Sequence, residues 1–87
     1  MAEQKLKWPL TKVIEVSWWD ANARSAWGSR EEYMHHDIAP CLTVGYLLKQ
    51  TKKSVTVVMT QGADFDDVNQ AISIPMNWVE KIKVLRK

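Results

Sequence analysis

The chain has 87 residues, a mass of 10.1 kDa and a formal net charge of +2, and 46% of its residues are hydrophobic. These values are typical of one small globular domain and exclude a disordered or collagen-like chain, while the charge is too small to indicate DNA binding by itself. No apolar run reaches the roughly 18 residues of a membrane span, and residues 1–10 lack the apolar core of a secretory signal. We therefore expect a cytoplasmic protein without a membrane partner.

The first predicted strand is residues 12–19, where apolar and polar side chains alternate. Ile14, Val16 and Trp18 fall on one face, which is typical of a half-buried strand. Trp19 falls on the opposite face, so we expect its indole to leave the core. Residues 20–28 are small or turn-forming and predict a loop.

A short helix is predicted next, at about residues 30–36. Residues 29–32 (Ser-Arg-Glu-Glu) match a capping box, in which the serine and the last glutamate each bind the other's backbone amide. Pro40 limits the helix because it disfavours helical dihedrals at the residue before it. So short a helix is unstable alone, and we expect it to pack on the rest of the fold through Tyr33 and Met34.

The remaining chain predicts strands at 41–49, 54–61, 70–74 and 79–85, with a hairpin loop at 50–53, an acidic loop at 62–67 and one helical turn at 75–78. The sets expected to share a face are Leu42, Val44, Tyr46 and Leu48, then Val55, Val57 and Met59, then Ile82 and Val84. Gly45, on the face opposite to Leu42, indicates a bend or the close approach of another backbone.

Five short strands with one helix between the first two predict an all-β fold, a small and strongly bent barrel. Closing the sheet removes the exposed edges that five short strands otherwise present. This domain spans residues 12–87 and follows a polar, basic segment at 1–11, in which Trp8-Pro9 is expected to act as an anchor.

The pattern of core and turn residues resembles a group of short bacteriophage proteins, mostly of unassigned function. The matching residues are Ile14 to Val16, Trp18, Asp20, Trp27, Val44 to Leu48, Val55 to Val58, Ile72 to Pro75 and Val79 to Leu85. The resemblance implies an Sm-like or Src-homology-3-like barrel. It also implies a homo-oligomer joined through sheet edges, and a viral protein that acts in the host cytoplasm by occupying or sequestering a target.

No set of residues with catalytic spacing is present, so we predict that the protein is not an enzyme and needs no cofactor. His35 and His36 are adjacent in the predicted helix and point about 100° apart, so they cannot chelate one metal together. The acidic loop lacks the central glycine and distal glutamate of a Ca²⁺ loop. Cys41 is the only cysteine, which excludes an intrachain disulfide, and we expect a buried thiol.

Tryptophan is unusually frequent, with five in 87 residues. Trp19 and Trp27 flank a loop of small residues, and Arg24 and Arg30 lie beside them in sequence. Indoles can stack on a flat ligand and arginine can bind phosphate, so these four residues are the predicted ligand site. The alternative is that both indoles pack under the helix or in a subunit interface.

A second candidate surface is basic. The termini are positively charged, and if the first and last strands are neighbours, Lys12, Lys81, Lys83 and Arg86 form one patch. The leading hypothesis is a non-enzymatic module that sequesters an anionic, nucleotide-type immune signal or occupies a host protein. The alternative is a nucleic-acid-binding barrel, and a solvated basic face would serve neither role.

Overall fold

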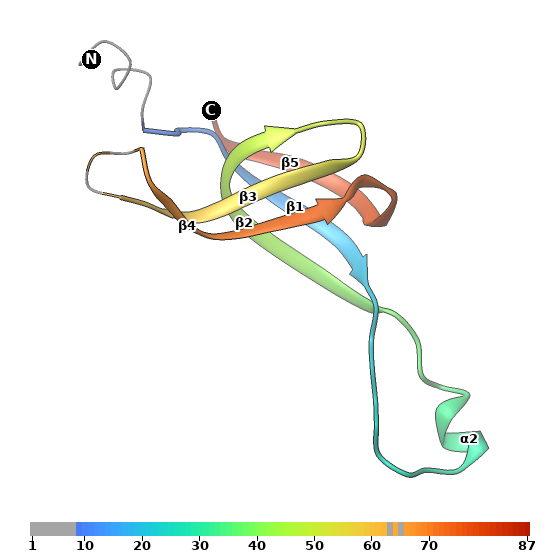
Figure 1. The fold of residues 1–87 in the computed structure, drawn as a ribbon. Helices are drawn as coiled ribbons and strands as arrows, with labels where there is room; N and C mark the ends of the chain where they lie inside the picture. Colours follow the sequence, from blue (N-terminus) through green and yellow to red (C-terminus); the bar gives the residue numbers. More distant parts are fainter. Residues whose placement is uncertain (1–8, 63, 65) are drawn as a thin grey trace.

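The protein is one antiparallel sheet of five strands, seen in a computed structural model that describes residues 9–62, 64 and 66–87 (Figure 1). The strands are β1 (Val13–Asp20), β2 (Ala39–Gln50), β3 (Ser54–Gln61), β4 (Val68–Pro75) and β5 (Val79–Arg86). Helix α2 (Arg30–Tyr33) lies between β1 and β2, and the 3₁₀ turn η1 (Met76–Trp78) lies between β4 and β5. The predicted mainly β class, with one helix between the first two strands, is therefore confirmed. The expected Trp8 anchor lies outside the described residues.

The core lies on one face of the sheet and follows the alternation predicted for β1. Its buried residues are Ile14, Val16 and Trp18 of β1, Val55 and Val57 of β3, and Ile74 of β4. Cys41 and Leu47 of β2 and Ile82 of β5 pack against them. Fully burying one such side chain stabilises the fold by about 1.5–3 kcal/mol, so this cluster holds the sheet together.

The predicted closure into a barrel is wrong. The strand order is β4-β3-β2-β1-β5, so β4 and β5 are the two edges of an open sheet, with no pairing between them among the described residues. A sharp bend buries the core instead. Gly45 makes the bend possible, because a Cβ at this position would lie 2.5 Å from Cγ1 of Val57 and 2.8 Å from the carbonyl oxygen of Val58. The close approach predicted at Gly45 is confirmed.

Residues 21–38 leave the end of the sheet and form a projecting arm, which carries α2 near its outer end (Figure 1). The capping box is confirmed, since the amide of Glu32 donates to Oγ of Ser29 at 3.1 Å and the amide of Ser29 donates to Oε1 of Glu32 at 3.3 Å. The helix is shorter than predicted, and it buries no residue. The molecule is consequently elongated, with extents of 61 × 23 × 21 Å.

The expectation that the helix packs on the sheet through Tyr33 and Met34 is also wrong. Met34 is 81% exposed. Tyr33 packs within the arm, where its hydroxyl donates to the carbonyl oxygen of Ala26 and the guanidinium of Arg24 lies 4.8 Å from its ring centroid. These local contacts replace the sheet contacts that so short a helix was expected to need. No helix in the described part of the chain is long and apolar enough to cross a membrane.

Candidate ligand site at the base of the arm

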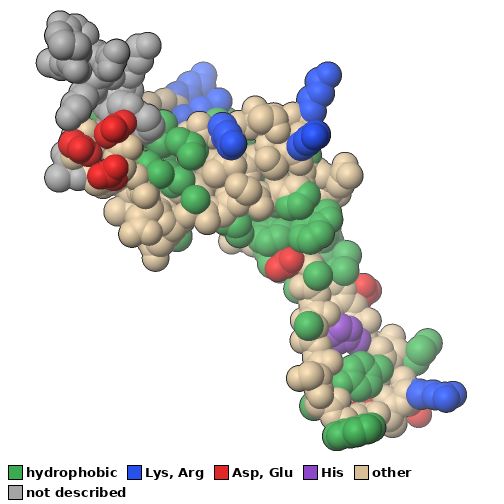
Figure 2. All heavy atoms as spheres, viewed as in Figure 1, with side chains coloured by type: hydrophobic (Ala, Val, Ile, Leu, Met, Phe, Trp, Pro, Cys, Tyr) green, Lys and Arg blue, Asp and Glu red, His purple; other side chains and the backbone are tan. Residues whose placement is uncertain are grey.

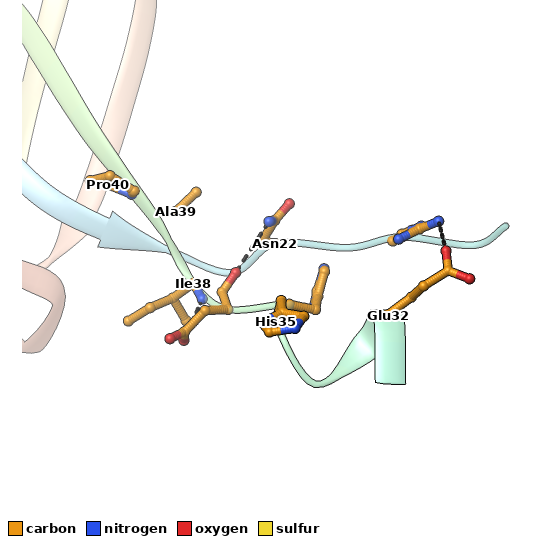
Figure 3. A pocket seen from close by; sticks show the side chains of 9 residues that line it. Asn22, Glu32, His35, Ile38, Ala39 and Pro40 are labelled. Carbon is orange, nitrogen blue, oxygen red and sulfur yellow. Dashed lines mark hydrogen bonds and ion pairs between the residues drawn. The ribbon is translucent and has the colours of Figure 1, made fainter. Parts of the chain in front are cut away.

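Two hollows adjoin where the arm leaves the sheet. The aromatic hollow, about 340 Å³, is lined by Trp19, Asp20, Ala21, Ile38, Asn77 and Trp78. The polar hollow, about 470 Å³, is lined by Asn22, Arg24, Glu32, His35, His36, Asp37, Ile38, Ala39 and Pro40 (Figure 3). Ile38 lines both hollows, so they adjoin at this residue. In Figure 2, apolar side chains gather at this junction between the sheet and the arm.

The aromatic hollow follows from the alternation in β1. Trp18 enters the core, where its Nε1 donates to Oγ1 of Thr43 at 2.9 Å, and so Trp19 turns to the other face. The turn η1 places Trp78 against Trp18, with the ring centroids 6.4 Å apart and the planes at 9°. Trp19 and Trp78 each remain about 40% exposed in the hollow. Two half-exposed indoles of this kind can hold a planar ring by stacking.

The polar hollow is shaped by hydrogen bonds within the arm. The side-chain amide of Asn22 donates to the carbonyl oxygen of Asp37 at 3.1 Å (Figure 3). This bond joins the outgoing and the returning segment of the arm. Oδ1 of Asp37 accepts from the amide of Ile38 at 2.7 Å. Arg24 reaches Oε2 of Glu32 at 3.7 Å, with both side chains about half exposed. The hollow therefore offers one guanidinium, two imidazoles and an amide beside two engaged carboxylates.

The four residues predicted as the ligand site are only partly brought together. Trp19 lines the aromatic hollow and Arg24 lines the polar hollow. Trp27 and Arg30 line neither, and Trp27 is fully exposed farther along the arm. The residue that the sequence interpretation missed is Trp78, which lies in the helical turn predicted at 75–78 and was not among the four predicted site residues. The available signal was the predicted turn directly before the last strand, because pairing of the first and last strands places that turn beside Trp18.

The predicted basic patch lies mainly on β5. Lys81 pairs with Ser17, Lys83 with Glu15 and Arg86 with Val13, and the register shift between Val13 and Ile14 brings Arg86 onto the same face as the two lysines. Arg86 lies over the Tyr46 ring at 5.8 Å and its Nε donates to the carbonyl oxygen of Thr11. Lys12 lies two residues before Ile14, so alternation places it on the core face of the sheet. It is therefore on the face opposite to Lys81, Lys83 and Arg86 and does not complete the predicted patch.

Groups that could support metal or thiol chemistry are not assembled in the part of the chain that the structure describes. Those residues contain no cluster of three or more histidine, cysteine or acidic side chains that could hold a metal ion. Cys41 is half-buried, with its sulfur 3.7 Å from the carbonyl oxygen of Ala39. No known protein family, curated protein or solved structure matches this chain. Its function is therefore inferred from the geometry of the hollows.

Proposed function

We propose that the protein is a non-enzymatic binding module that sequesters a planar, anionic small molecule of the nucleotide type at the base of the arm. One observation carries the proposal: the aromatic hollow and the polar hollow meet at Ile38. A nucleotide joins a flat ring to a phosphate, and this surface offers two indoles in one hollow and a guanidinium in the adjoining hollow.

The ring of such a ligand would stack on Trp19 and Trp78. Base–aromatic stacking is worth about 1–3 kcal/mol for each base, and Trp78 is held for this role by its own stack on Trp18. Both indoles keep about 40% of their surface exposed, which leaves area for a ring to contact. This part of the site sets the preference for planar ligands.

The phosphate would be bound by Arg24 and the amide of Asn22. Arg24 must exchange Glu32 for the ligand, and the exposed pair at 3.7 Å costs at most about 1 kcal/mol to break. A guanidinium–phosphate contact is charge-assisted and can be bidentate, which offsets this cost and the repulsion between the phosphate and the nearby Glu32 carboxylate. Glu32 keeps its place through the capping box, since it still binds the amide of Ser29.

The proposed setting is a bacteriophage protein in the host cytoplasm, where the captured molecule is an immune signal. This setting rests on the resemblance of the core and turn residues to short phage proteins. The other role open to a non-enzymatic binding module of this kind is to bind and occupy a host protein.

A nucleic-acid-binding role is the second candidate, and one specific observation favours it. Lys81, Lys83 and Arg86 lie on one face of β5, and Arg86 also covers the Tyr46 ring. A row of cations beside an aromatic ring suits a single strand. Such binding would weaken steeply with salt, because each neutralised phosphate releases counterions.

The experiment is heat release of bound molecules from the purified protein, followed by mass spectrometry and titration with nucleoside monophosphates and cyclic dinucleotides. We expect a nucleotide to be released and Trp19→Ala to weaken its binding at least tenfold, with Trp27→Ala as the matched tryptophan control. No binding of any nucleotide by the wild-type chain would overturn the proposal. Binding only of oligonucleotides, lost in high salt and by Lys83→Ala, would favour the second candidate.

A further inference from the structure

Asp20, the last residue of β1, brings a carboxylate to a hollow that is otherwise mainly apolar. It lines the aromatic hollow together with Trp19 and Trp78. Stacking of a planar ring, the role proposed for this hollow, does not use an acidic side chain. A carboxylate close to a bound anion is unfavourable unless the ligand donates hydrogen bonds to it. Asp20 therefore indicates which donor groups the ligand carries.

The position of Asp20 is where the two hollows adjoin. It pairs with Ala39 in the ladder between β1 and β2. Ala39 lines the polar hollow next to Ile38, the residue that both hollows share. Along the chain, Asp20 separates Trp19 in the aromatic hollow from Asn22 in the polar hollow. The aspartate thus lies between the proposed site of the ring and the proposed site of the phosphate.

The carboxylate is oriented by the backbone and keeps one oxygen for a ligand. Oδ1 accepts from the amide of Ala21 at 2.8 Å, a local bond that aspartate commonly forms where regular structure ends. In the part of the chain that the structure describes, Oδ2 has no hydrogen-bond partner and no lysine or arginine pairs with Asp20. The residue is half-buried. It therefore presents an acceptor that is held in place and accessible.

In a nucleotide, the group between the base and the phosphate is the sugar, and its free hydroxyls are donors. An ionised carboxylate can only accept hydrogen bonds, and its bonds to a hydroxyl are stronger than those between neutral groups. Acidic side chains bind the ribose 2′-hydroxyl in dinucleotide-binding folds. The same hydroxyl is the group by which proteins distinguish ribose from deoxyribose.

We infer that Asp20 accepts a hydrogen bond from the 2′-hydroxyl of the ligand, so that the site selects ribonucleotides over 2′-deoxyribonucleotides. The inference rests on the proposed function, because it concerns the sugar of the nucleotide proposed above. Ribose supplies the donor that Oδ2 lacks. Deoxyribose leaves the carboxylate beside an anion with no donor, and a site built to bind a hydroxyl rejects the analogue without it.

Isothermal titration calorimetry tests the selection, with nucleoside 5′-monophosphates and 3′,5′-linked cyclic dinucleotides, each beside its 2′-deoxy counterpart. We expect wild-type protein to bind the ribose form at least about tenfold more tightly. Asp20→Ala should reduce this ratio to below about threefold. Asp20→Asn keeps the size of the side chain and an oxygen for the Ala21 amide, and should also lower the ratio. Asp66→Ala, the matched control, removes the same charge from an exposed loop and should keep the ratio.

The affinity for the 2′-deoxy ligands separates a lost hydrogen bond from a damaged site. Asp20→Ala should bind them at least as tightly as wild type does, because the variant removes a carboxylate that they leave without a donor. Weaker binding of both sugar forms at an unchanged ratio would assign Asp20 a structural role and overturn the inference.

The remaining outcomes distinguish the inference from the proposed function. If no nucleotide binds to the wild-type chain, the proposed function is wrong and the inference falls with it. If ribose and deoxyribose forms bind equally well, or if the preference survives both Asp20 variants, the inference alone is wrong. A changed preference among bases with an unchanged preference for ribose would place Asp20 at the edge of the base, which also contradicts it.

Discussion

The sheet and the arm are stabilised in different ways. Every buried residue that the structure describes lies in β1, β3 or β4, whereas the arm, residues 21–38, buries none. The arm keeps its shape through a capping box, one ion pair and a tyrosine that packs on Arg24. The sheet therefore carries the stability of the fold, and residues of the arm can change with little effect on that stability.

The largest expected contrast comes from removing one apolar side chain in each region. Ile74→Ala should lower the free energy of unfolding by about 2–5 kcal/mol, because the isoleucine is fully buried and its loss leaves a cavity. Met34→Ala, on the arm, should change it by less than about 0.5 kcal/mol in the monomer. Urea unfolding at concentrations where the protein is monomeric measures both, and equal losses would contradict the division between the regions.

Glycine offers a second contrast. Gly45→Ala should destabilise the protein by about 1–3 kcal/mol, because the new methyl group meets Val57 and the backbone of Val58, which cannot move without straightening the bend. Gly28→Ala in the arm meets the Tyr33 ring at 3.1 Å, and a shift of a few tenths of an ångström in that half-buried side chain relieves the contact. Its effect should be close to zero. Urea denaturation midpoints of the two variants test this difference, and equal midpoints would contradict it.

A polar pair within the sheet should give a smaller effect. Thr56 is buried and its hydroxyl bonds Oγ of Ser73 on β4 at 2.8 Å. Ser73→Ala leaves the Thr56 hydroxyl without this partner and should cost about 1–2 kcal/mol. The double variant with Thr56→Val should recover most of the loss, and a loss that simply adds would show that the pair does not act as a unit.

The smallest effect on global stability is expected from the helix cap. Ser29→Ala removes the acceptor of the Glu32 amide, and such caps are worth about 0.5–2 kcal/mol to a helix. Because α2 buries nothing, this loss should appear as faster amide hydrogen exchange at residues 32–36 with little change in the melting temperature. A large fall in melting temperature would mean that the arm is coupled to the sheet.

Local patterns predicted the sheet well. Alternation placed Ile14, Val16 and Trp18 in the core, the bounds of β3 agree with the prediction, and Gly45 and the capping box behave as expected. The incorrect predictions concern which face of an element is buried by other parts of the fold. Leu42 and Val44 are apolar and periodic, yet they lie on the face away from the core, because alternation shows which side chains share a face and not which face is buried.

The same limit explains the candidate site. Trp19, near the end of β1, and Arg24, at the start of the arm, could be predicted because they are only five residues apart in the chain. Trp78 and Trp19 are far apart in the chain, and only the pairing of β1 with β5 brings η1 to this end of the sheet. The prediction of a closed barrel was wrong for a related reason. Closure requires pairing between the edge strands β4 and β5, and no local sequence pattern specifies such a contact.

The second strand limits how the protein can change over evolution. The 12 residues of β2 begin in the polar hollow, which Ala39 and Pro40 line. Leu42 to Val44 then line a third hollow, of about 410 Å³, on the sheet. The strand finally reaches the bend at Gly45 and the core at Leu47. Deleting one residue within this stretch would exchange the faces of all that precede it. Insertions and deletions are therefore costly in β2, whereas residues 21–28 can vary in length.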